Sequence, residues 1–378
     1  MSNFKIISDN HVNGSSLPDY IKAQNDFINR RIDSNSSLYK ESYFLDSWLK
    51  AYNSKCEKVI FLRFFDSELQ ENGGCFAFVC LKITSHHFFT EYSNGGFLFG
   101  YPGPAILPGY EPDFFRLLST WLSSKQRFWN CKIGPTREPL HELVSFSELN
   151  ISSKTLVRTS APYIEITEDY RPPSDNHRNM LRKKSRLLAS KRHEYVFIDS
   201  SSHPKFSELF ENWISMLKIR WPNGHFMIDE QRHRLFYSNL AKELSDRKEF
   251  LFAALIIDDK PAAIIYGVLQ KDRFYDFTAA MSLDFSHFGP SQLLIKKLLE
   301  DLPKRGVSIL DFMNDMEPYK LQWTNHVAPR FEYEIHSHFF MCTQFRNRWN
   351  PMKLTLRFTS PKNFLRFIKN PVATLKRF

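Results

Sequence analysis

Cysteine and glycine are scarce in this sequence, which has five cysteines and 13 glycines among 378 residues. The number of cysteines is odd and none has CxxC spacing, so we expect neither a disulfide framework nor structural zinc. Histidines are paired at His336 and His338 and at His86 and His87, but neither pair has a third ligand at metal-binding spacing. We therefore expect no metal site.

Long uncharged apolar runs are also absent. A membrane-spanning helix needs about 20 apolar residues, and no stretch of the sequence approaches that length. The first ten residues lack the basic-then-apolar layout of a secretion signal. From these absences we expect a cytoplasmic protein.

The sequence is rich in aromatic side chains and in basic charge. With 42% hydrophobic residues, 24% charged residues and 36 phenylalanines, it has the composition of a folded globular protein, and its length allows two domains. Much of the net charge of +10 comes from residues 343–378, which contain nine Lys or Arg and no acid. Between Arg171 and Arg192, eight basic residues accompany one acid. Both segments predict an anionic partner or surface.

The apolar spacing of the first half predicts a mixed α/β domain. The predicted elements are helices near 44–52 and 114–122 and strands at 58–65, 75–83 and 128–133. Residues 1–40 are polar and lack clear periodicity, so we assign them as an accessory segment. The N-terminal domain then spans 41–167.

The second half begins after a proline-containing link, with a basic helix near 178–192. A clear amphipathic helix at 206–217 and a weaker one near 235–240 follow. Next come an antiparallel meander of three strands, a glycine-bearing turn, a helix and a strand, at 250–257, 262–269, 273–281, 286–291, 292–302 and 308–312. A last strand at 331–341 is expected to close this domain, which spans 168–342 and precedes a tail at 343–378.

Four passages in this order resemble a known family. They are APYIEI before the basic stretch HRNMLRKKSRLL, the strand pair LIIDDKPAAIIYGVL, the turn FGPSQLLI and the run DFMNDMEPYKLQW. Together they resemble the GCN5-related N-acetyltransferase (GNAT) superfamily, and within it the acetyltransferase group named for the cellulose-biosynthesis protein CelD, related to the FemAB transferases. The resemblance implies an α/β (α+β) fold of tandem GNAT-like domains, each a mixed, mostly antiparallel sheet flanked by helices. It also implies acetyl-CoA or a longer acyl-CoA as co-substrate.

The glycine-bearing turn is the first candidate site. A helix N-terminus offers unpaired N–H groups and a positive dipole end, Gly289 permits close backbone approach, and Pro290 fits the first helical turn. We therefore expect Phe288, Gly289, Pro290, Ser291 and Gln292 to bind the phosphates of the cofactor. Only Gly289 matches the family's turn pattern cleanly, and the alternative is a helix cap without a ligand.

The run DFMNDMEPYKLQW is the second candidate site. Acyl transfer to an amine needs a base for the ammonium proton and an acid for the leaving thiolate. We assign Glu317 or Asp315 as the base and Tyr319 as the acid, with Lys320 holding an anionic group and Trp323 contacting the substrate. The alternative is a solvated acidic loop whose two aromatic residues pack inward.

Two further features are candidates for the same site. Asp276 lies on the third meander strand, where alternation places it on one face with Phe274, Thr278 and Ala280, and it is a secondary candidate for the base. On the basic helix, Arg178 and Arg182 share a face at i, i+4 spacing with Arg186. We expect Arg178 and Arg182 to bind an anionic part of the substrate, the alternative being a solvated charged face.

The tail at 343–378 mixes cations with apolar residues such as Trp349, Leu354 and Phe364. This mixture is typical of a peripheral element that binds an anionic membrane. The same side chains would also suit RNA, which we do not expect as the partner, or plain packing. Prolines at three positions of the tail limit any helices in it to short ones.

We thus expect an acyl-CoA-dependent N-acyltransferase that acts on an amine of a cell-envelope sugar or lipid precursor, at the inner face of the cytoplasmic membrane. Three alternatives stay open. The enzyme makes a lipid amide from a long-chain acyl-CoA, it takes its acyl group from an aminoacyl-tRNA as FemAB-like proteins do, or it is a non-catalytic scaffold with a GNAT fold.

Overall fold

The structure analysed is a computed structural model of the 378-residue chain. It describes residues 4–11, 47, 50–51, 58–69, 74–85, 90–93, 104–125, 129–136, 140–146, 152–220, 230–313 and 316–336. The expected tail at 343–378 and most of the helix expected near 44–52 lie outside these residues.

Thirteen strands are described. They are β1 (Phe4–His11), β2 (Lys58–Asp66), β3 (Cys75–Ser85), β4 (Thr90–Ser93), β5 (Ala105–Ile106), β6 (Trp129–Thr136), β7 (Ser152–Glu165), β8 (His193–Ile198), β9 (Phe250–Ile257), β10 (Lys260–Gln270), β11 (Arg273–Met281), β12 (Ile309–Asp311) and β13 (Val327–His336). The described helices are α3 (Glu111–Lys125), α4 (Leu140–Leu143), α5 (Asp175–Ala189), α6 (Phe206–Arg220), α8 (Glu230–Asp246) and α9 (Pro290–Asp301), with short 3-10 helices η3 (Leu283–Phe288), η4 (Leu302–Arg305) and η5 (Lys320–Gln322).

All strands belong to one sheet, in the order β1-β2-β3-β4-β6-β13-β7-β12-β11-β10-β9-β8, with β5 beside β3. The described pairings are antiparallel except for β4 with β6 and β11 with β12. Helix α9 packs on one face of the C-terminal strands, and α6 lies on β10 and β11 from the other face. The predicted mixed α/β fold with a mostly antiparallel sheet is confirmed.

One order of pairing occurs twice along the chain. In the N-terminal half, β2, β3 and β4 form an antiparallel meander, and α3 then leads to β6, which pairs parallel to β4. In the C-terminal half, β9, β10 and β11 form the meander, and α9 leads to β12, which pairs parallel to β11. The fold therefore contains an internal repeat that the sequence does not display.

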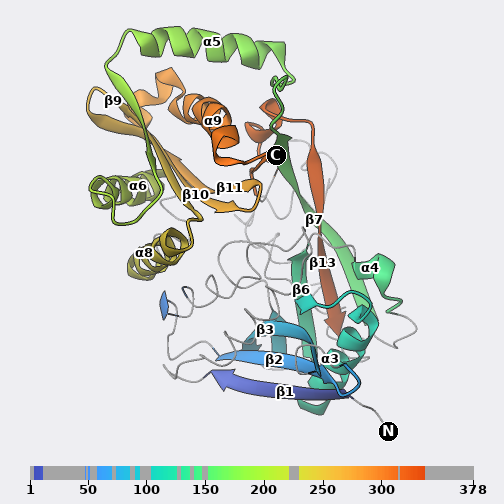
Figure 1. The fold of residues 1–378 in the computed structure, drawn as a ribbon. Helices are drawn as coiled ribbons and strands as arrows, with labels where there is room; N and C mark the ends of the chain where they lie inside the picture. Colours follow the sequence, from blue (N-terminus) through green and yellow to red (C-terminus); the bar gives the residue numbers. More distant parts are fainter. Residues whose placement is uncertain are drawn as a thin grey trace, which may run out of the picture.

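The two halves are joined by a pair of long strands, β7 and β13 (Figure 1). Strand β7 pairs with β13 along most of its length and with β12 at its end. Strand β13 pairs with β7 and with β6, so it completes the N-terminal part of the sheet. The expectation that this last strand closes the C-terminal domain is wrong, because a strand can pair with any edge that the fold brings within reach, and its local sequence does not specify which.

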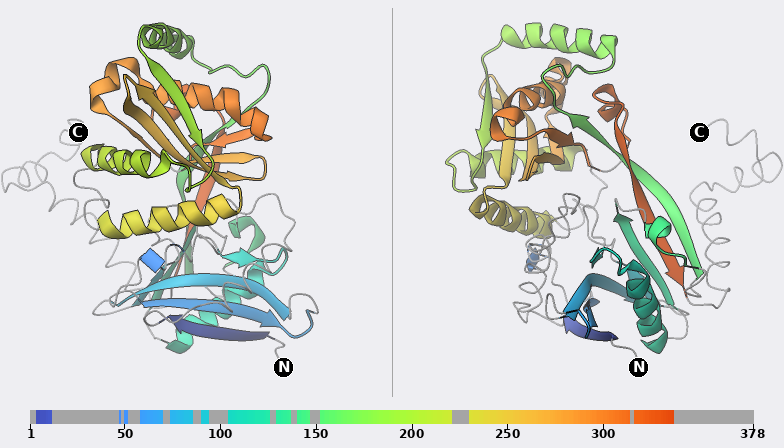
Figure 2. Two further views of the ribbon diagram at one scale, coloured as in Figure 1. Left: turned by 60° about the vertical axis from the view of Figure 1, so that its left-hand side comes forward. Right: turned by 45° about the vertical axis from the view of Figure 1, so that its right-hand side comes forward.

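The start of the chain also differs from expectation. Residues 4–11 form β1, an edge strand paired antiparallel with β2 along its whole length. Phe4 packs edge-on against Phe76, with ring centroids 5.9 Å apart. The beginning of the expected accessory segment is therefore part of the N-terminal sheet (Figure 2).

Candidate functional site

The candidate site lies where two parallel strands part. Strands β11 and β12 pair only over Arg273–Tyr275 and Ile309–Asp311. Beyond that point β12 ends, whereas β11 continues to Met281 and among the described residues pairs only with β10. Asp276 is the first residue of β11 past the separation, so its backbone stands at the opening between the strands.

A bulge lies at the same place. Gly267 of β10 is opposite Asp276, whereas the preceding residue, Tyr266, is opposite Thr278, which leaves Phe277 as the extra residue. The expected alternation of this strand is therefore broken. Tyr275, Phe277 and Ala280 share one core cluster, although the predicted pattern put Ala280 on the opposite face from the other two.

Asp276 is buried, and burial raises the pKa of its carboxyl group to about 6. The positive charges of Lys320 and Arg220 act against this rise, while Glu317 and Asp311 add to it. Four charged groups thus shift the pKa of this one carboxyl group. The structure places Asp276, the secondary candidate for the base, near Glu317, Tyr319 and Lys320 of the run after β12.

Those three residues form their own contacts. The Nζ atom of Lys320 lies 3.3 Å from a carboxylate oxygen of Glu317, and Lys320 is buried. Tyr319 stacks edge-on near Phe312, with ring centroids 6.4 Å apart. Burial, followed by the charges of Asp276 and Glu317, raises the pKa of the Tyr319 hydroxyl, which therefore stays protonated at neutral pH.

Arg220 is a site residue that sequence reasoning missed. It ends α6, and its guanidinium donates to the Ala279 carbonyl on β11 at 3.3 Å. Its charge acts on both Asp276 and Tyr319. The sequence shows only a cation at the end of an amphipathic helix, so no local signal points to a sheet 59 residues later.

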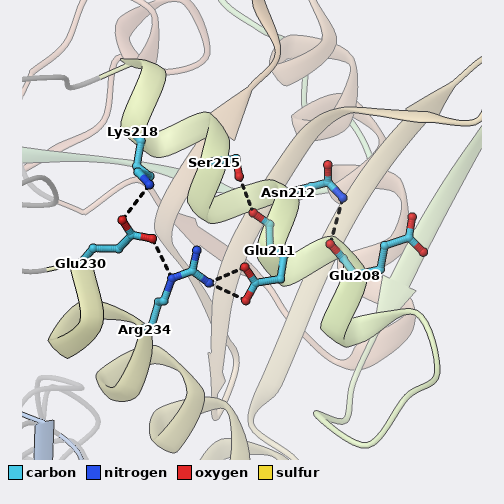
Figure 3. A network of polar contacts seen from close by, with 7 residues as sticks. All are labelled: Glu208, Glu211, Asn212, Ser215, Lys218, Glu230 and Arg234. Carbon is cyan, nitrogen blue, oxygen red and sulfur yellow. Dashed lines mark hydrogen bonds and ion pairs between the residues drawn. The ribbon is translucent and has the colours of Figure 1, made fainter.

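The end of α6 is held by ion pairs with α8 (Figure 3). Lys218 lies 2.7 Å from Glu230, and Glu230 also pairs with Arg234 at 2.8 Å. Arg234 in turn contacts Glu211, two turns before Lys218 on the same face of α6, so the two helices are tied at two levels. The hydrogen bonds from Lys218 and Arg234 lower the pKa of Glu230. This network fixes the helix end from which Arg220 reaches the sheet.

A buried charge cluster lies next to the opening between β11 and β12. Asp311, the last residue of β12, lies 3.2 Å from Arg273 of β11 and 3.8 Å from Arg330 of β13. Arg330 is fully buried and Asp311 nearly so. The other carboxylate oxygen of Asp311 accepts a hydrogen bond from the backbone N–H of Met313 at 2.8 Å. Asp311 thus connects the two strands at the opening to the strand that completes the N-terminal sheet.

The glycine-bearing turn forms as predicted. Gly289 has φ of 63° and joins η3 to α9, Pro290 is the first residue of α9, and Phe288 is buried. The N–H of Gly289 donates to Ser286, and that of Gln292 donates back to the Gly289 carbonyl, at 3.0 and 3.1 Å. Pro290 has no N–H, and Ser291 is the second residue of α9. Lys184 of α5 donates to the His287 carbonyl beside it.

Trp323 and Gln292 bind each other. The indole N–H of Trp323 donates to the side-chain oxygen of Gln292 at 2.8 Å, and Trp323 is buried against the ring of His177. Tyr170 donates to the Trp323 carbonyl. The ring of Trp323 thus lies inside the core, where it joins α9 to the start of α5, and its contact with a substrate stays a prediction. The side-chain oxygen of Gln292 is likewise engaged.

The two arginines expected to bind substrate have different surroundings. Arg178 contacts Asp175 and donates to the carbonyls of Pro172 and Pro173, so it fixes the turn that begins its own helix. Its contact with an anionic part of the substrate stays a prediction. Arg182 is exposed and donates to Asn179 at 3.2 Å.

One predicted site residue, Asp315, lies outside the residues that the structure describes. Within them, no group of three His, Cys, Asp or Glu is arranged to hold a metal ion. No helix in the described part of the chain is long and apolar enough to cross a membrane.

Comparison with solved structures finds the same fold at low identity. The C-terminal domain of a putative lysylphosphatidylglycerol synthetase from Agrobacterium fabrum is 10% identical, with a TM-score of 0.51 over 84% of this chain and 92% of that one. L-PGS from Bacillus licheniformis is 10% identical, with a TM-score of 0.52 over 85% and 93%. FemX is 9% identical, with a TM-score of 0.52 over 86% and 96%. At such identity the likeness shows the fold alone.

Comparison by sequence gives one family and no individual relative. No curated protein matches the chain significantly. The family described as acetyltransferase (GNAT) domain matches residues 175–321, from the first residue of α5 to the residue after Lys320. The matched segment contains Asp276, the turn at Gly289 and Tyr319. Residues 175–321 of this chain are therefore similar to an acetyltransferase (GNAT) domain.

Proposed function

We propose that this protein is an N-acyltransferase that moves an acyl group from acyl-CoA to an amine of a cell-envelope sugar or lipid precursor. The observation that carries the proposal is the cluster of Asp276, Glu317, Tyr319 and Lys320 at the opening between β11 and β12, inside the segment that is similar to a GNAT domain. A carboxyl group with a pKa near the working pH and a protonated phenol at one place suit the two proton transfers of this reaction.

In this proposal the amine nitrogen attacks the thioester carbonyl, and the bond between the carbonyl carbon and sulfur breaks. Asp276 accepts the proton that the ammonium group must lose, because its pKa of about 6 leaves it ionised at neutral pH. The Tyr319 hydroxyl donates its proton to the leaving sulfur, and Tyr319 recovers a proton from the second N–H that the nitrogen loses as the amide forms. Lys320 and Arg220 supply positive charge near the carboxylate and the phenol. Glu317 holds the buried Lys320 in place.

The turn before α9 fits the phosphates of CoA in part. No acidic residue occurs in the first turn of α9, and the ammonium group of Lys184 is next to the turn. Ser291 contributes both an N–H and a hydroxyl at the positive end of the helix. CoA would supply an activated thioester there, and this chain would hold its phosphates through Ser291 and Lys184.

The first half of the repeat does not suit a second donor. The helix at the equivalent place, α3, carries Glu111 and Asp113 in its first turn, and Glu111 already accepts the N–H of Gly109 at 2.8 Å. Carboxylates at a helix N-terminus occupy the position that a phosphate would need. The proposal therefore assigns one acyl-donor site, in the C-terminal half.

An aminoacyl-tRNA is the second candidate donor. It is favoured by the small number of N–H donors in the turn, since Gly289 and Gln292 bond within it and Pro290 has none. An aminoacyl-tRNA would place no pyrophosphate at this turn, so it would not need free N–H donors there. The amine acceptor and the remaining chemistry would be the same.

Calorimetric titration with CoA, acetyl-CoA and a long-chain acyl-CoA tests the proposal. Ser291→Asp should abolish CoA binding by charge repulsion. Ser207→Asp is the matched control, because Ser207 is also the second residue of an α-helix and is exposed. Wild-type binding, loss in the first variant and retention in the second would support the CoA site. No binding of any thioester by the wild type would refute it and leave the aminoacyl-tRNA donor to be tested by acyl transfer.

A further inference from the structure

The outward face of α5 carries cations that have no acidic partner. At 100° per residue, Arg182, Lys183 and Arg186 lie opposite the buried residues of this helix, and all three are exposed. Arg182 contacts only the Asn179 amide, and within the described part of the chain no carboxylate pairs with Lys183 or Arg186. From Arg182 to the end of the helix this face is therefore positive, while the exposed Asp175 at the start of the helix pairs with Arg178.

Several other exposed cations of the same half are neutralised. Lys205 pairs with Glu194 at 2.8 Å, Lys297 with Glu300 at 2.9 Å, and Arg192 with Asp259 at 2.9 Å. A paired cation attracts a further anion less than an unpaired one does, so the group of unpaired cations on α5 favours a partner of the opposite sign.

Exposed apolar side chains flank this face. Leu187 lies about 100° around the helix from Arg186 and is 42% exposed, and Leu283 of η3, which packs beside α5, is 61% exposed. No aromatic residue occurs in α5. Base-stacking surfaces of RNA-binding proteins depend on aromatic rings, whereas leucine beside Lys and Arg suits the boundary between lipid headgroups and acyl chains. One carboxylate, Asp284, lies on η3.

The helix is also accessible as a surface. It lies at the outer end of the C-terminal half, on the side of α9 away from α8, in both views of Figure 2. Lys184 connects it to the turn before α9. A flat partner that met α5 would thus lie against the end of the domain next to that turn.

We propose that the part of α5 that carries Arg182, Lys183 and Arg186, with Leu187 on its flank and the neighbouring Leu283 of η3, docks on the surface of an anionic lipid membrane. The cations meet the headgroups, and the two leucines enter the interface between headgroups and acyl chains. This contact is separate from the tail at 343–378, and it does not depend on the acyl-transfer chemistry proposed above. Acylation of a soluble amine would continue whether or not the docking occurs.

Vesicle sedimentation of the full chain tests the docking. The vesicles are phosphatidylcholine alone and phosphatidylcholine mixed with phosphatidylglycerol. The test variant carries Arg182→Gln, Lys183→Gln and Arg186→Gln. Its matched control carries Lys205→Gln, Lys296→Gln and Lys297→Gln, which remove the same charge elsewhere in the domain. Leu187→Ser is compared with Leu235→Ser, another exposed leucine.

The wild type should bind only the anionic vesicles, and the α5 triple variant should bind them about ten-fold or more weakly. The control triple should differ less than about two-fold, because its cations are paired. Leu187→Ser should weaken vesicle binding and Leu235→Ser should not. Equal loss in the two triple variants, or no vesicle binding by the wild type, would overturn the proposal. Binding to a duplex RNA that needs the three cations but not Leu187 would assign the face to nucleic acid instead.

Discussion

The Nζ atom of Lys320 lies 3.3 Å from the Glu317 carboxylate, yet the lysine side chain is 6% exposed and the glutamate 43%. A buried ammonium group therefore depends on a carboxylate that solvent reaches. Glu317 acts on Asp276 and Tyr319 as well, so changes to this one pair should alter the whole cluster.

Glu317→Gln should lower the free energy of unfolding by about 1 kcal/mol. The buried Lys320 ammonium group then lacks this negative partner, whereas little desolvation of the half-exposed Glu317 is recovered. Chemical denaturation measures this. Glu300→Gln, which breaks exposed pairs with Lys296 and Lys297, is the control and should cost less than about 0.5 kcal/mol. An equal effect of the two changes would contradict the dependence of Lys320 on Glu317.

Asp276→Asn should change how stability depends on pH. Since the pKa of Asp276 is about 6 in the folded chain and 3.8 is the ordinary value, the folded state holds this proton more tightly than the unfolded state. Stability from this group is full below about pH 4 and is lost as the pH rises through about 6, by at most about 3 kcal/mol. The variant should match the wild type at pH 4 and exceed it at pH 8 in urea unfolding. A difference that stays constant across this range would show that Asp276 does not titrate there.

Gly289→Ala should cost about 1 kcal/mol through backbone strain, because φ is 63° and the added Cβ would meet only the Lys184 side chain, at 3.7 Å. Gly306→Ala is a matched control, with φ of 76° and open space around the added atom. Both variants should unfold at similarly reduced temperatures. Only Gly289→Ala should weaken CoA binding, and equal effects on binding would argue against a ligand at the turn.

Arg330→Met should lower the free energy of unfolding by about 3 kcal/mol, since it removes one of two arginines beside the buried Asp311 carboxylate. Adding Asp311→Asn should recover part of that loss. The buried carboxylate that has lost one of its two arginines is then replaced by a neutral amide. Arg305→Gln, which breaks an i,i+4 pair with Asp301, should cost about 1 kcal/mol or less. A loss in the double variant equal to the sum of the two single losses would show that the two groups do not interact.

Much of the C-terminal half could be predicted from local pattern. Strands β9, β10 and β11 appear as apolar runs separated by polar turns, and α6 appears in the 3.6-residue spacing of its apolar side chains. Gly289 and Pro290 mark the start of α9 through backbone preferences that belong to these residue types alone. The bulge at Phe277 was not predictable, because its cause is the pairing with β10 and not the composition of β11.

The sequence by itself determined most elements of the C-terminal half, their order, and the type of chemistry available in the run from Asp311 to Trp323, because these follow from periodicity and side-chain type. Only the tertiary structure decided which of these residues meet. It buried Trp323, engaged Arg178 in the turn that begins α5, brought Arg220 to Asp276 from another helix, and added β13 to the N-terminal sheet. These are contacts between segments far apart in the chain, set by packing and strand pairing, which no local pattern of residues encodes.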